Sequence, residues 1–123
     1  MAEGSWEERA AAGEVLAQSA GSDADTRLLE LLLDREDTVV TFRTAAALLK
    51  QRTVPAFRLL VLASAETDDS HRDWIADAID EFIVRSQGEA EPFLRQALET
   101  IRNGGDAVCS QAAREWEAWY RWS

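Results

Sequence analysis

The chain has 123 residues, of which 46% are apolar, and its 23 acidic residues outnumber 13 basic ones to give a net charge of −10. This length and apolar share suit one compact domain, while the acidic excess opposes binding to the polyanionic backbone of nucleic acid. One cysteine excludes an intramolecular disulfide, and one cysteine with one histidine excludes the usual structural zinc clusters. The sequence shows no membrane-spanning run and no secretory leader, so we expect a cytoplasmic protein without a membrane contact, a cofactor or a bound metal.

Residues that favour helices dominate throughout. Leucine, alanine, glutamate and arginine recur, and β-branched residues never alternate with polar ones over the length of a strand. The pattern predicts an all-α fold with about seven helices whose short loops imply antiparallel neighbours. The predicted helices cover about 6–20, 26–34, 38–52, 55–65, 71–86, 92–102 and 107 to the end.

Several of these helices have clear start and stop signals. Ser5 and Glu8 have the spacing of a capping box ahead of the first helix, and Asp25 is expected to cap the second. Pro55 belongs in the first turn of the fourth helix, where its missing N–H would have no helical partner in any case. Gly88 suits the end of the fifth helix, because glycine readily adopts a left-handed cap conformation.

The apolar pattern predicts which helix faces form the core. The second helix has five leucines between residues 28 and 33 and is apolar on nearly every side, so we expect it inside the fold. Spacings of three and four predict the buried face of the third helix as Val39, Phe42, Ala46 and Leu49. The same spacings in the fifth helix select Ile75, Ala78, Ile79 and Phe82.

The chain also contains an internal repeat. Residues 42–46 align with residues 71–75 at an offset of 29, and the preceding helices align at the same offset. A fainter third copy includes residues 109–113. The repeated unit is therefore a pair of helices.

The repeated unit has an acidic turn followed by a hydrophobe, an arginine and small residues, as between Asp37 and Ala47. This pattern resembles the HEAT-like repeats common in bacteria, in which antiparallel helix pairs stack into a solenoid. The resemblance covers residues 26–122 as about three repeats of a single domain, residues 1–123, with residues 1–22 as a capping helix and loop. A compact helical bundle is the alternative architecture.

The resemblance also implies specific contacts. In that family an acid in the turn and the arginine of the second helix commonly bond along the stack. By position, the residues concerned are Asp37 and Arg43 in the first repeat, and Glu66, Asp68 and Arg72 in the second. The third copy departs from the pattern, because Ser110 stands where the arginine is expected.

One face of the fifth helix gathers carboxylates that lie three or four residues apart: Asp69, Asp73, Asp77, Asp80 and Glu81. They could form a docking surface for a basic partner or a weak divalent-cation site built from oxygen ligands. The alternative is an ordinary solvated helix face, which is what charge runs usually form.

Aromatic residues are concentrated near the end of the last predicted helix: Trp116, Trp119, Tyr120 and Trp122. They either close the end of the core or leave an exposed patch suited to self-association. Aromatic residues at helical spacing usually pack in the core, so we expect core closure with Trp122 partly exposed.

No catalytic arrangement is evident. Cys109 and His71 are the candidates for nucleophilic chemistry, but nothing in their spacing supports a working pair, and we expect both to be structural. We therefore predict a non-catalytic module that binds another protein. The acidic face would favour a basic partner. The alternatives are an acidic inhibitor or immunity protein that masks a nuclease or toxin, and an enzyme or ligand-binding bundle that uses buried carboxylates.

Overall fold

The computed structural model describes residues 5–34 and 36–120, apart from the side chains of residues 119 and 120. These residues form seven α-helices and one short 3₁₀ helix, and they contain no strand, so the all-α prediction is confirmed. The elements are α1 (Trp6–Leu16), η1 (Ala17–Ser19), α2 (Asp25–Leu32), α3 (Thr38–Gln51), α4 (Val54–Glu66), α5 (Asp69–Arg85), α6 (Glu91–Arg102) and α7 (Ala107–Tyr120).

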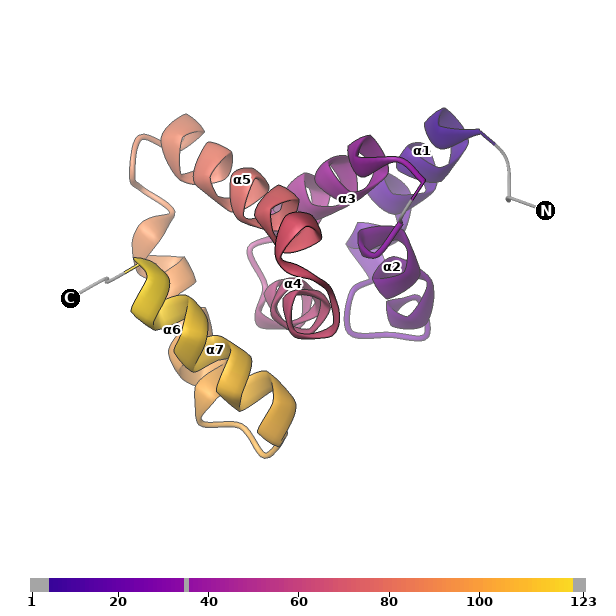
Figure 1. The fold of residues 1–123 in the computed structure, drawn as a ribbon. Coiled ribbons are helices and arrows are strands. Elements are labelled where there is room, and N and C mark those ends of the chain that lie inside the picture. Colours follow the sequence, from indigo (N-terminus) through magenta and orange to yellow (C-terminus); the bar gives the residue numbers. More distant parts are fainter. Residues whose placement is uncertain (1–4, 35, 121–123) are drawn as a thin grey trace.

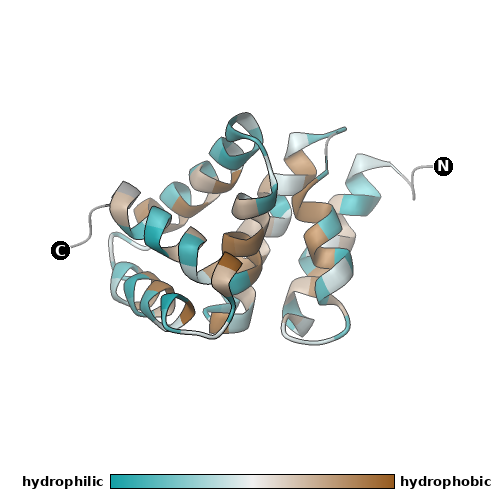
Figure 2. Ribbon diagram, turned by 60° about the horizontal axis from the view of Figure 1, so that its bottom comes forward, coloured by the Kyte–Doolittle hydropathy of each residue, from teal (hydrophilic) through white to brown (hydrophobic). Residues whose placement is uncertain are grey.

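The helices lie in two rows. In one row α3 packs between α1 and α5, and in the other α4 lies beside α2 and also contacts α6 and α7 (Figure 1). Helices α6 and α7 pack against each other at the α4 end of the second row. Apolar residues are concentrated on the inward sides of the helices, so the core lies between the rows (Figure 2).

The local signals for the helix ends mostly act as predicted. Ser5 Oγ accepts a hydrogen bond from the N–H of Glu8, and the Glu8 carboxylate accepts one from the N–H of Ser5 at 3.1 Å, which completes the capping box. Pro55 lies in the first turn of α4. Gly88 follows α5 with a φ of +81°, and its N–H donates to the carbonyl of Ile83 at 3.0 Å.

The predicted cap of α2 is wrong. Ala24 occupies the N-cap position without a side-chain hydrogen bond, and Asp25 is the first residue of the helix. The Asp25 carboxylate accepts a hydrogen bond from the N–H of Gly21 at 2.7 Å, so it closes the preceding turn instead of the helix end. Gly21 has a φ of +92°, which explains why glycine suits this turn.

The buried face of α3 also differs from the prediction. Leu49 is buried as predicted, but Val39 is 42% exposed and Phe42 and Ala46 are only partly buried. The buried residues of α3 are Val40, Thr41, Thr44, Ala45, Leu48 and Leu49. Helix α3 is covered by α1 and α5 on its flanks and by α2 and α4 beneath. This covering also buries small and weakly polar residues, which hydrophobic periodicity does not select.

Of the predicted α5 face, Ile75, Ala78 and Ile79 are buried and Phe82 is only partly buried. The repeat alignment, however, fails in this helix. At the offset of 29, buried Ala45 of α3 corresponds to Trp74, which is 41% exposed. At an offset of 30 it corresponds to buried Ile75, whereas α2 and α4 keep the offset of 29, which matches buried Leu32 with buried Val61. A shift of one residue turns a helix face by about 100°.

Candidate functional site

The candidate site is the outer face of α5. His71, Ile75, Ala78 and Ile79 bury the inner face of this helix. Asp68 is the N-cap of the helix, and its carboxylate accepts a hydrogen bond from the N–H of His71 at 2.8 Å. With the inner face held in the core, the predicted carboxylates are placed on the solvent side.

The five carboxylates differ in their partners. Asp69 bonds to Arg72 at 3.1 Å, and Glu81, which is partly buried, bonds to Arg85 at 2.7 Å. The other three are exposed and form no ion pair with a described side chain: Asp73, Asp77 and Asp80. The outer face of α5 therefore presents three neighbouring negative charges that are not neutralised locally.

Apart from Arg27 with Glu30 inside α2, the other ion pairs between described side chains join different elements. They are Arg9 with Asp34, Arg43 with Glu14, Arg52 with Glu89, Arg58 with Asp106, and Arg102 with Glu117. The arginines are thus largely used to connect helices and loops, and the ion pairs on α5 leave its central carboxylates free.

An exposed tryptophan lies beside these charges. Trp74 is 41% exposed and precedes Asp77 by three residues and Glu81 by seven, so the three side chains share one flank of α5. Val84 is 74% exposed on the same helix. The sequence analysis did not select Trp74 as a candidate site residue, although its position outside the predicted Ile75 face indicated that it could be exposed.

The structure offers no support for the divalent-cation interpretation. Within residues 5–34 and 36–120, no three side chains of the ligating types come close enough together to hold a metal ion. What the α5 carboxylates provide is therefore a charged surface.

The first pair of residues implied by the repeat alignment has other contacts. Asp37 is the N-cap of α3, and its carboxylate accepts a hydrogen bond from the N–H of Val39 at 2.9 Å. Arg43 binds the Glu14 carboxylate through Nη2 at 2.9 Å and through Nε at 3.2 Å. Arg43 therefore links α3 to α1.

In the second repeat, Arg72 links two consecutive helices. Its Nε donates to the carbonyl oxygen of Ser64 at 3.0 Å, near the end of α4. Its other described contact is with Asp69, while Asp68 caps α5 and Glu66 is an exposed residue at the end of α4.

One residue of the predicted aromatic patch lies in the core. Trp116 is buried, and its Nε1 donates to Ser64 Oγ at 2.7 Å, which joins α7 to α4. Trp122 and the side chains of Trp119 and Tyr120 lie outside the described residues.

His71 and Cys109 are both buried in the core. His71 Nε2 lies 2.8 Å from the carbonyl oxygen of Leu32, to which it donates, and 3.0 Å from Thr41 Oγ1, so the ring connects α5 with α2 and α3. Burial, together with the nearby Asp106 carboxylate, raises the pKa of the Cys109 thiol. Both environments suit packing residues, and a raised pKa opposes thiolate formation.

No protein-family model matches the chain, and no curated protein or solved structure is significantly similar to it. In the part of the chain that the structure describes, every helix is too short or too polar to cross a membrane.

Proposed function

We propose that this protein is a non-catalytic helical module that binds a basic partner protein through the outer face of α5. The observation that carries the proposal is the combination of three free carboxylates with exposed Trp74 on one helix. Carboxylates attract and orient a basic surface, and tryptophan is among the residues that contribute most to binding energy at interfaces.

The arrangement favours arginine or lysine on the partner. A cation placed over the Trp74 indole would gain a cation–π interaction and would also lie near Asp77 and Glu81 on the same flank. Glu81 already accepts from Arg85, so Asp77 is the carboxylate with spare hydrogen-bonding capacity there.

We further propose that the two rows of helices form a short HEAT-like stack. Support comes from the side-by-side packing of α1, α3 and α5, and of α2 and α4, with each consecutive pair joined by a short loop (Figure 1). The α6 and α7 pair departs from a regular stack, because both helices pack on α4.

The proposal of a non-catalytic role is supported by the surroundings of the two reactive side chains, His71 and Cys109. His71 bonds to a backbone carbonyl and a threonine in the core, and burial raises the pKa of Cys109. Neither environment resembles that of an activated nucleophile.

The test compares two charge reversals of equal size. Asp73→Arg/Asp77→Arg changes the proposed surface, and Glu7→Arg/Glu99→Arg changes exposed residues on α1 and α6. The immobilised proteins would be incubated with lysate of the source organism, and the bound proteins would be identified by mass spectrometry. A partner that the wild type and the control retain, and that the α5 variant loses, is the expected result.

The partner should then be purified and its affinity measured at several salt concentrations. We expect binding to weaken as salt rises and when Trp74→Ala is introduced. Equal capture by both charge-reversal variants would refute the proposal. If the partner is a nuclease or a toxin and this protein inhibits it, the result would identify the protein as an inhibitor or immunity protein.

A further inference from the structure

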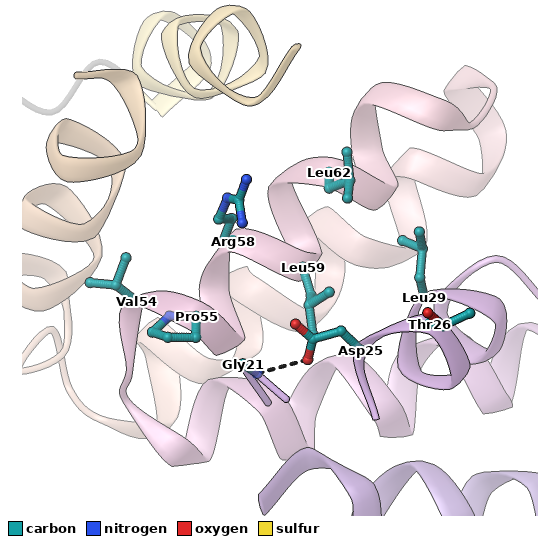
Figure 3. A pocket seen from close by; sticks show the side chains of 9 residues that line it. All are labelled: Gly21, Asp25, Thr26, Leu29, Val54, Pro55, Arg58, Leu59 and Leu62. Carbon is teal, nitrogen blue, oxygen red and sulfur yellow. Dashed lines mark hydrogen bonds between the residues drawn. The ribbon is translucent and has the colours of Figure 1, made fainter. Parts of the chain in front are cut away.

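A second surface lies in the other row of helices. A hollow of about 470 Å³ separates α2 from α4, with Leu29 on the α2 side and Leu59 and Leu62 on the α4 side (Figure 3). Because α5 belongs to the opposite row, this groove is distinct from the acidic surface of α5 (Figure 1).

The apolar side chains that border the groove also pack on the core, in which Leu59 is buried, but Leu29 and Leu62 are covered only in part. The nearly all-apolar α2 was expected to be covered on several sides, but Leu29 is only partly buried and borders the hollow. Leu62 of α4 is likewise only partly buried. The structure thus leaves large apolar side chains from two neighbouring helices around one open space.

Two charged side chains border the groove, Asp25 and Arg58, and of these only Arg58 has an ion-pair partner among the described residues. The Asp25 carboxylate accepts a hydrogen bond from the Gly21 N–H at 2.7 Å, and Asp25 and Leu59 both line the groove (Figure 3). Arg58 also borders the hollow, but its guanidinium points away from Asp25 and bonds to Asp106 at 3.3 Å. An occupant would therefore find apolar walls next to a carboxylate with remaining acceptor capacity.

We propose that this groove binds an apolar peptide segment that carries a lysine or arginine and belongs to a partner protein. Apolar side chains of the segment pack between Leu29, Leu59 and Leu62, and its cation bonds to Asp25. The lining residues of α4 run from Val54 to Leu62, which corresponds to about 12 Å along a helix. That length accommodates about three or four extended residues at roughly 3.3 Å each.

The direct test is a titration of the ¹⁵N-labelled protein, followed by NMR, with the capped peptide acetyl-Leu-Val-Leu-Arg-amide. We expect saturable shifts at the amides of Gly21, Asp25 and Leu29. The matched peptide acetyl-Leu-Val-Leu-Glu-amide should cause little change, because its carboxylate would face Asp25.

Two variants locate the interaction. Asp25→Asn keeps an oxygen acceptor for the Gly21 N–H and removes the charge, so we expect the Kd to rise about fivefold, while Asp23→Asn in the same loop leaves it unchanged. Thr26→Trp places a large ring at the rim of the groove without altering the core, and it should abolish the shifts.

Several results would overturn the inference. They are no saturable shift with the arginine peptide, equal binding of the glutamate peptide, an unchanged Kd in Asp25→Asn, or shifts confined to α5. The last result would leave the proposed α5 surface standing, and loss of the α5 interaction would not affect this titration, so the two proposals fail separately.

Discussion

The contact between α1 and α3 provides the sharpest stability prediction. A Cβ atom added at Gly13 would lie 2.1 Å from Thr44 Oγ1, 3.0 Å from Thr44 Cβ and 3.1 Å from Thr44 Cγ2. Rotation of the threonine side chain can move Oγ1 and Cγ2, but its Cβ is fixed to the backbone. Gly13→Ala must therefore push the two helices apart by a few tenths of an ångström.

The expected magnitude follows from two opposing effects. Overpacking a tight core contact costs about 1–3 kcal/mol, and this contact is at the severe end because three atoms lie within 3.1 Å. Replacing glycine by alanine in a helix returns about 1 kcal/mol through propensity. We expect Gly13→Ala to lower the free energy of unfolding by about 1–2 kcal/mol.

Urea denaturation followed by circular dichroism would measure this change. Val15→Ala provides a control in the same helix, because Val15 is 67% exposed and should tolerate alanine without loss. Gly13→Ala/Thr44→Ala should recover part of the loss, since the 3.0 Å approach to Cβ remains. A Gly13→Ala protein that is more stable than the wild type would refute the packing argument.

Three further predictions concern buried polar groups. Thr44 Oγ1 is buried and has no hydrogen-bond partner among the described residues, so Thr44→Val should leave the free energy of unfolding unchanged or raise it by about 1 kcal/mol. A loss of more than about 1 kcal/mol in urea denaturation would contradict the assignment. Burial alone would raise the pKa of Asp34, but the Asp37 N–H and the Arg9 guanidinium help to lower it overall. The charged form therefore stabilises the fold above the unfolded pKa, so the stability deficit of Asp34→Asn at pH 7 should shrink below about pH 4, and a pH-independent deficit would contradict this. Cys109 should react with a thiol reagent at pH 8 only as fast as the protein opens, and similar rates in native and urea-unfolded protein would show that the thiol is accessible.

The positions of the helices were predictable because their signals act over a few residues. The Ser5 and Glu8 capping box, the first-turn position of Pro55 and the left-handed Gly88 all involve backbone groups within one turn. Such contacts form in the same way wherever a helix is placed in the fold. The main local error was the prediction that Asp25 caps α2, because its carboxylate accepts a hydrogen bond from the N–H of Gly21 in the preceding turn.

The candidate site was predictable only in part. The spacing of the carboxylates placed them on the outer face of α5, since that face opposes buried Ile75 and Ile79. The sequence did not predict which carboxylates lack an ion pair, because the pairing of Arg85 with Glu81 depends on the rotamers that the two side chains adopt. The exposure of Trp74 was not predicted either, because the sequence analysis left this residue outside the buried face of α5 without assigning it to a surface.

The amino-acid sequence by itself determined the all-α class, the approximate helix limits and the acidic character of α5, because these depend on composition and on neighbours within about one helical turn. The tertiary structure decided the packing of Gly13 on Thr44, the ion pairs between helices, the burial of Trp116 and the groove beside Asp25. Each of these features joins residues far apart in the chain. Their contacts depend on the distance and rotation between helices, which periodicity along one helix does not specify.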